Sequence, residues 1–111
     1  MKRLSALLFS LVLSVILLAQ TKSPRLATVT PDTGNSSVSY TAAGENLTKD
    51  SIKDLYITNG KDDIKVEIVS QKDDSIVFKV PASTKPGRYS LMILTADGKQ
   101  FLEQPVKLNI E

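Results

Sequence analysis

The sequence contains no cysteine and no histidine, and these two absences exclude several kinds of chemistry. Neither a Ser-His nor a Cys-His nucleophile system can form, and neither can a thiolate site or a histidine-rich zinc site. Without disulfides, the domain has to be held together by packing alone. Tryptophan is also absent, and the chain has three tyrosines and three phenylalanines. Aromatic platforms of the kind that bind sugars are therefore few.

An excess of positive charge is missing too, once the N-terminal segment is set aside. The chain has 14 basic and 12 acidic residues, but Lys2 and Arg3 stand before an apolar run from Leu4 to Ala19. Removing these two basic residues leaves 12 basic against 12 acidic residues. Binding of a nucleic acid requires a net positive face, so we expect no nucleic-acid partner.

The N-terminal layout of positive charge followed by an apolar run is typical of a secretory signal. The run is shorter than the ~20 residues of a membrane-spanning helix, so a spanning anchor is the less favoured alternative. We expect a signal peptide over residues 1–19, a flexible leader over 20–25 and one domain over 26–111. Cleavage after Ala19 and cleavage after Thr21 each fit part of the small-residue pattern.

This organisation indicates an exported protein, located in the periplasm, at the cell surface or outside the cell. The absence of cysteine argues against a lipid anchor. No membrane span is expected in the mature part of the chain.

Apolar and polar residues alternate along most of the chain from residue 38 onward, and this period of two places one face of each strand against a core. Asn59-Gly60 and Asp97-Gly98 are hairpin signals, and we expect the last strand to bend or bulge around Pro105. Turn residues separate seven expected strands, at 26–30, 38–42, 55–57, 64–68, 76–80, 88–95 and 106–110. The sequence therefore predicts an all-β fold, a seven-stranded immunoglobulin-like β-sandwich.

Four short motifs, in this order and spacing, resemble the IPT/TIG domain over residues 27 to 110. They are Thr30-Pro31, Gly44-Glu45-Asn46-Leu47, Val80-Pro81 and Pro86-Gly87-Arg88-Tyr89. Leu47 stands where the family more often has Phe, and the segment before Val38 is less rich in glycine than in many members.

The resemblance implies an immunoglobulin-like module. Members of the family occur in cell-surface receptors, in secreted bacterial proteins, as accessory modules of polysaccharide-active enzymes and in some DNA-binding transcription factors, so the fold does not choose a function. We interpret Gly44 as a residue with a positive φ at the end of a strand. Tyr89 either ties the preceding corner by a phenol hydrogen bond or serves as a core aromatic.

No set of residues in the sequence amounts to a catalytic, cofactor or metal site, and we expect no enzyme. Asp62-Asp63 and Asp73-Asp74 are paired acids in polar turns next to lysines. They are interpreted as solvated loops rather than a weak calcium site, because calcium needs six to eight converging oxygens. Ser83-Thr84-Lys85 is likewise interpreted as a loop, since nothing suggests the buried lysine that a Ser-Lys pair requires.

One surface is a candidate for binding a partner. If the third and sixth strands turn Leu55, Ile57 and their counterparts inward, then Tyr56, Met92 and Leu94 point outward. These two strands are neighbours in a seven-strand sandwich, so the three side chains would form an exposed apolar patch. We expect the patch to bind another protein or a second copy of the chain, unless a loop or the leader covers it.

Carbohydrate binding is the alternative. Tyr56 and Phe101 are the two aromatic residues of the mature chain that the alternation does not place inward. Either could serve as the platform on which a sugar stacks.

Overall fold

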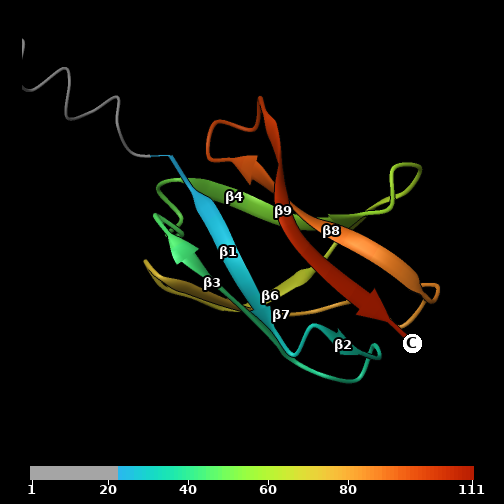
Figure 1. Ribbon diagram of the computed structural model, residues 1–111. Helices are drawn as coiled ribbons and strands as arrows, with labels where there is room; N and C mark the ends of the chain where they lie inside the picture. The colour runs from blue at the N-terminus through green and yellow to red at the C-terminus, as the bar shows by residue number, and fades with distance from the viewer. Residues whose placement is uncertain (1–22) are drawn as a thin grey trace, which may run out of the picture.

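The computed structural model describes residues 23–111, which form two packed β-sheets (Figure 1). The predicted signal peptide and residues 20–22 of the predicted leader lie outside the described residues. Between Ser23 and Glu111 every regular element is a strand, so this part of the chain contains no helix that could cross a membrane.

The first sheet has four strands in the order β1-β3-β7-β6, and the second has five in the order β2-β9-β8-β4-β5. The strands of the first sheet are β1 Arg25–Thr30, β3 Tyr40–Glu45, β6 Glu67–Gln71 and β7 Ser75–Lys79. Those of the second sheet are β2 Thr33–Gly34, β4 Ile52–Thr58, β5 Asp63–Lys65, β8 Gly87–Thr95 and β9 Phe101–Ile110. Neighbouring strands run antiparallel, except that β2 is parallel to β9. This arrangement confirms the all-β, immunoglobulin-like sandwich.

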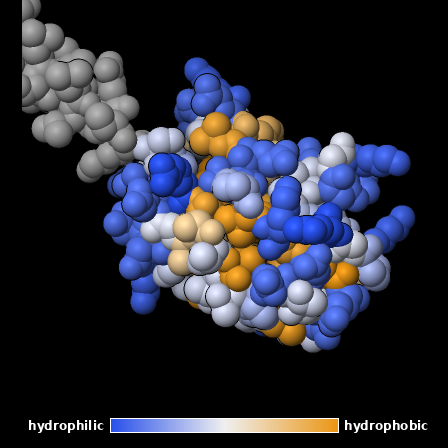
Figure 2. Space-filling model, viewed as in Figure 1, coloured by the Kyte–Doolittle hydropathy of each residue, from blue (hydrophilic) through white to orange (hydrophobic). Residues whose placement is uncertain are grey.

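The core lies between the two sheets and follows the predicted alternation. The four-stranded sheet contributes the buried residues Ile76 and Phe78 of β7, and the five-stranded sheet contributes Leu91 and Ile93 of β8. The rings of Tyr40 and Phe78 stack with their centroids 5.5 Å apart. Apolar residues also gather in the middle of the face shown in Figure 2, between β1 and β9, with polar residues around them.

Residues 23–111 contain nine strands where seven were predicted, and two segments account for the difference. The expected strand at 64–68 divides at Val66 into β5, which pairs with β4, and β6, which pairs with β7 in the other sheet. Val66 is buried at this crossover, and its N–H donates to the carbonyl of Leu55 at 3.0 Å. The expected turn after Pro31 contains β2, whose two residues pair with Asn109 and Ile110.

The end of the predicted leader is part of the folded domain. Pro24 is buried and Arg25 begins β1. The carbonyl of Ser23 accepts a hydrogen bond from Nδ2 of Asn46 at 3.1 Å. The expectation of a flexible segment up to residue 25 is therefore wrong for residues 23–25, because burial and strand pairing fix them.

Gly44 has a different role from the predicted one. A Cβ atom on Gly44 would lie 1.9 Å from the carbonyl oxygen of Arg25. The glycine thus allows β1 and β3 to approach closely, and the positive φ belongs to Asn46, at 57°.

Tyr89 plays both of the roles that the sequence allows for it. Its ring is buried in the core, and its hydroxyl donates to the carbonyl of Lys85 at 2.7 Å, which ties the preceding corner.

The last strand bulges around Pro105, as predicted. Ser90 pairs with Lys107 and Met92 pairs with Glu103, so three residues of β9 face one residue of β8. Both predicted hairpins are present, with β4 joined to β5 through Asn59-Gly60 and β8 joined to β9 through Asp97-Gly98.

Candidate partner-binding surface

The outer face of the five-stranded sheet brings together the three residues singled out in the sequence. β4 and β8 are neighbours, and Tyr56 pairs directly with Met92. Leu94 lies two residues further along β8, opposite Asp54. All three side chains point away from the core, since the alternate residues Leu55, Leu91 and Ile93 belong to it. The predicted placement of these side chains is therefore correct.

The predicted exposure is not correct for two of them. Met92 and Leu94 are each 7% exposed, although they lie outside the core cluster between the sheets. β8 is flanked by β4 on one side and by β9 on the other, and large side chains from both neighbours cover its outward residues. Met92 lies between Tyr56 and Glu103, and Leu94 lies opposite Phe101.

Phe101 is the exposed apolar residue on this face. It is 54% exposed, and its ring packs edge-on against Tyr56 with the centroids 5.3 Å apart. We call Tyr56, Met92, Leu94 and Phe101 the aromatic shelf. The sequence pattern indicates Phe101 as a possible sugar platform and does not place it in this patch. The turn at Asp97-Gly98 could have located Phe101 in the sequence, because this hairpin pairs Phe101 with Leu94 across β8 and β9.

A hydrogen-bonded turn holds the hairpin that carries Phe101. The carboxylate of Asp97 accepts from the hydroxyl of Thr95 at 2.6 Å and from the backbone N–H of Lys99 at 3.0 Å. The Thr95 hydroxyl is the larger cause, and together these donors lower the pKa of Asp97. The backbone N–H of Thr95 also donates to Gln100 at 3.0 Å, so the chain enters β9 in a fixed position.

Charged side chains of both signs surround the aromatic shelf. Lys65 and Asp54 form an ion pair at 3.5 Å on the β4–β5 side. Glu103 and Lys107 lie on the β9 side. Apolar residues thus occupy the middle of this face and charges occupy its edges.

A polar pocket of about 280 Å³ adjoins the shelf at the end where β8 begins. Its lining is made of Thr58, Asn59, Gly60, Arg88, Tyr89, Ser90, Glu103 and Lys107. Nζ of Lys107 donates to Oγ of Ser90 at 2.6 Å. A Ser-Lys nucleophile system requires a buried lysine, whereas Lys107 is exposed.

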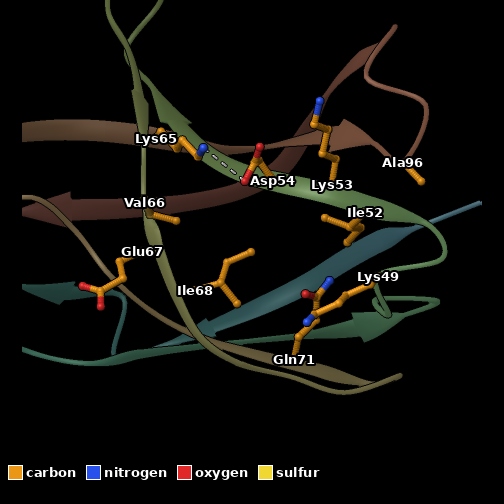
Figure 3. A pocket seen from close by; sticks show the side chains of 10 residues that line it. All are labelled: Lys49, Ile52, Lys53, Asp54, Lys65, Val66, Glu67, Ile68, Gln71 and Ala96. Atoms are coloured by element: carbon orange, nitrogen blue, oxygen red, sulfur yellow. Dashed lines mark ion pairs between the residues drawn. The ribbon is translucent and has the colours of Figure 1, made fainter.

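A larger groove of about 550 Å³ opens on the side of the sandwich, between β4 and β6 (Figure 3). The crossover at Val66 leaves this side open. Ile52 and Ile68 face the hollow, while Lys53 and Glu67 extend away from it. The lining charges are mixed and no donor set converges in the groove, so we assign no ligand to it.

The paired acids do not assemble into a metal site within the described residues. No group of three or more acidic side chains in residues 23–111 is arranged to hold a metal ion. The backbone carbonyls of Asp73 and Asp74 instead accept hydrogen bonds from Leu47 and Gly44, at 2.9 and 3.0 Å. Asp73 and Asp74 therefore belong to a structural turn beside β3.

Comparison with known proteins gives one positive result. The family model described as the IPT/TIG domain matches residues 24–110. The match covers nearly all the described residues and all four motifs noted in the sequence. No curated protein matches the chain significantly.

Proposed function

Since the chain belongs to the IPT/TIG domain family, we propose that it is a non-catalytic, exported binding module that contacts another protein through the aromatic shelf. Domains of this family are generally non-catalytic immunoglobulin-like modules that often mediate protein–protein or DNA contacts. Membership of the family therefore supports a binding role. The class of partner is inferred from the residues on the surface.

The observation that carries the proposal is the exposed ring of Phe101 on a sheet face that no second layer of the described chain covers. Phe101 packs against Tyr56 and shields Leu94 and Met92, which adds two further apolar side chains below the surface. Interface centres are enriched in Tyr, Phe and Met and are surrounded by a polar rim. The aromatic shelf and its charged edges have this composition.

The charges at the edges favour a protein over a nucleic acid. Lys65 and Lys107 are balanced by Asp54 and Glu103. A surface that binds nucleic acid has a net excess of Lys and Arg that neutralises phosphates. The shelf lacks such an excess, and mixed signs suit the mixed surface of another protein.

Export is supported by the sequence of the segment outside the described residues, with Lys2 and Arg3 before the apolar run. We expect the protein to be recovered from the periplasm, the cell surface or the medium, with an N-terminus near Gln20 or Lys22. Mass spectrometry of the N-terminal peptide from each cell fraction tests this. Recovery from the cytoplasm with Met1 intact would contradict export.

The partner contact is tested by affinity capture from the envelope and secreted fractions of the source organism. The purified protein is the bait, and Phe101→Ser is the variant. Val69→Ser is a matched control, because Val69 is 53% exposed but lies on β6 in the other sheet. We expect a partner that Phe101→Ser loses by about 30-fold or more, the effect of removing a binding hot spot of ~2 kcal/mol.

The outcomes of this capture are distinct. A partner retained by Val69→Ser and lost by Phe101→Ser supports the proposal, and sedimentation of the purified protein shows whether the partner is a second copy. Equal capture by both variants would contradict the aromatic shelf as the contact surface. Circular dichroism of each variant confirms that it is folded.

Carbohydrate binding is the second candidate, and the exposed Phe101 ring beside Tyr56 is the observation that favours it. Co-sedimentation with insoluble polysaccharides tests it, using the wild type and Tyr56→Ala. Binding by the wild type that Tyr56→Ala abolishes would place a sugar, and not a protein, on the aromatic shelf.

A further inference from the structure

We infer that the polar pocket beside the aromatic shelf is a subsite for a single carboxylate, carried by a partner segment whose neighbouring apolar side chain lies on Tyr56 and Phe101. The inference deepens the proposed function and rests on it, because it names the chemistry that a protein partner presents to this face.

Two cationic side chains lie at the mouth of the pocket. Arg88 and Lys107 are both exposed, and neither is within ion-pair distance of a carboxylate in residues 23–111. A guanidinium binds a carboxylate through two parallel hydrogen bonds, while an ammonium acts as a point charge. The hydrogen bond from Nζ of Lys107 to Ser90 holds that ammonium over the pocket before any ligand arrives. Such preorganisation lowers the cost of binding.

The floor of the pocket supplies hydroxyl donors. Thr58 and Ser90 pair across β4 and β8, and each is 6% exposed. Oγ of Ser90 accepts from Lys107, and Oγ1 of Thr58 accepts from the N–H of Gly60 at 3.2 Å. Both oxygens act as acceptors in these bonds, so each hydroxyl keeps its one proton to donate to another acceptor. A carboxylate offers only acceptors, which matches this donor set.

The net charge of the pocket lining favours a ligand with one negative charge. Arg88 and Lys107 contribute two positive charges and Glu103 contributes one negative charge, so the lining has a net charge of +1. A carboxylate carries one negative charge and balances it. A phosphate group with a charge near −2 would bring the additional charge close to Glu103, where like charges repel. The pocket is therefore suited to a carboxylate over a phosphate.

The spacing of the strands links the pocket to the aromatic shelf. Ser90 in the floor and Met92 under Tyr56 are two residues apart on β8. That separation is ~7 Å at the rise of a strand. An extended partner segment covers that distance in two residue steps, so an apolar side chain on Tyr56 and Phe101 would be followed two positions along by a carboxylate in the pocket.

The carboxylate could belong to a chain terminus or to an acidic side chain, and two probes distinguish them. One is N-acetyl-phenylalanyl-glycine, whose carboxylate is a terminus. The other is an N-acetyl phenylalanine–glycine–aspartate tripeptide amide, whose carboxylate is a side chain. N-acetyl-phenylalanyl-glycine amide supplies the ring without the charge, and inorganic phosphate supplies an anion without the ring.

Each probe is titrated into the purified, ¹⁵N-labelled protein at pH 7, and amide chemical shifts report the binding site. We expect at least one carboxylate probe to bind at least tenfold more tightly than the neutral amide, with shifts at Thr58, Ser90 and Met92. Arg88→Gln and Lys107→Gln should each remove most of that tenfold preference. Lys99→Gln, a matched change of an exposed cation in the β8–β9 loop, should leave it unchanged.

Equal affinity for acid and amide, tighter binding of phosphate, or shifts away from this pocket would each overturn the inference. The result is separate from that of the capture experiment. Carboxylate binding with no protein partner would sustain the pocket and defeat the proposed function. A partner lost by Phe101→Ser but unaffected by Arg88→Gln and Lys107→Gln would sustain the proposed function and defeat the carboxylate subsite.

Discussion

Gln104 connects the two sheets although it is a polar residue in a buried position. Its Oε1 accepts a hydrogen bond from the backbone N–H of Leu26 at 2.8 Å, and its Nε2 donates to the carbonyl of Leu102 at 3.1 Å. The first bond links β9 to the edge strand β1. An unpaired N–H in a buried position is costly, so the glutamine satisfies a donor that β1 would otherwise leave without a partner.

We predict that Gln104→Leu lowers the free energy of unfolding by about 1–3 kcal/mol, because the N–H of Leu26 loses its acceptor inside the protein. Urea denaturation followed by circular dichroism measures the change. Gln100→Leu is the control, since Gln100 is exposed and uses only its backbone in the β8–β9 loop. The control should stay within about 0.5 kcal/mol of the wild type. Equal losses in both variants would contradict this role of Gln104.

Tyr40 couples the stability of the core to pH. Burial is the larger cause and the charge of Glu111 the smaller one, and together they raise the pKa of Tyr40. A raised pKa means that the folded protein holds this proton more tightly than the unfolded chain. The resulting stabilisation is complete below the ordinary tyrosine value of ~10 and is lost as the pH rises through the pKa of the folded state.

We predict that Tyr40→Phe reduces the loss of stability as the pH rises above about 10. At neutral pH the variant should be less stable by about 1 kcal/mol, because the hydroxyl no longer donates to the carbonyl of Asn35. The gap to the wild type should narrow as the pH rises. Glu111→Gln should weaken the pH dependence less than Tyr40→Phe does. Parallel curves for the wild type and Tyr40→Phe would disprove the coupling.

At the scale of elements, β8 shows what alternation can and cannot predict. The alternation correctly places Tyr89, Leu91 and Ile93 inward and Met92 and Leu94 outward. It does not predict that the outward residues are buried, because their exposure depends on the neighbouring strands. Tyr56 on one side and Phe101 on the other are large enough to cover them. The size of cross-strand neighbours becomes known only once the register is known.

The crossover between β5 and β6 is missed for a related reason. Ile64, Val66 and Ile68 all pack against the core, as the alternation predicts. The backbone hydrogen bonds, however, pass from β4 before Val66 to β7 after it. Side chains that face the space between two sheets follow the same period whichever sheet holds the backbone. The strand pattern could therefore be predicted, but the change of sheet could not.

We predict that Gly44→Ala destabilises the protein by about 1–3 kcal/mol or more, because the new Cβ would overlap the backbone of β1 and force the strands apart. Thermal and urea unfolding measure the loss. Gly60→Ala is the comparison, since it has open space around it and a φ of +92°. Its cost should be about 1–2 kcal/mol, from the backbone conformation alone. A Gly44→Ala variant as stable as the wild type would show that β1 can move freely.

At the scale of the whole molecule, residues 23–111 should fold as one unit. The two sheets share one core cluster and contain no cysteine, so unfolding should be a single transition that reductant does not change. We predict that a chain beginning at Ser23 unfolds in this way. One beginning at Leu26 should melt several degrees lower, because it lacks the buried Pro24 and the first residue of β1.

Circular dichroism and tyrosine fluorescence measured on the same thermal ramp test both statements. Coincident curves support a single unit, and separate curves would divide it. Equal melting temperatures for the two chains would mean that residues 23–25 contribute nothing, although they are fixed in the fold.

The parallel pairing of β2 with β9 has a mechanical consequence. β2 lies near the start of the domain, and β9 leads to its C-terminal end. The N–H groups of Asn109 and Glu111 donate to the carbonyls of Asp32 and Gly34, at 2.8 and 2.9 Å. A pull on the two ends draws these parallel strands in opposite directions along their length, so the bonds between them bear the load in shear and must break together. Tension applied across the two ends of the domain would therefore be resisted by these bonds in shear.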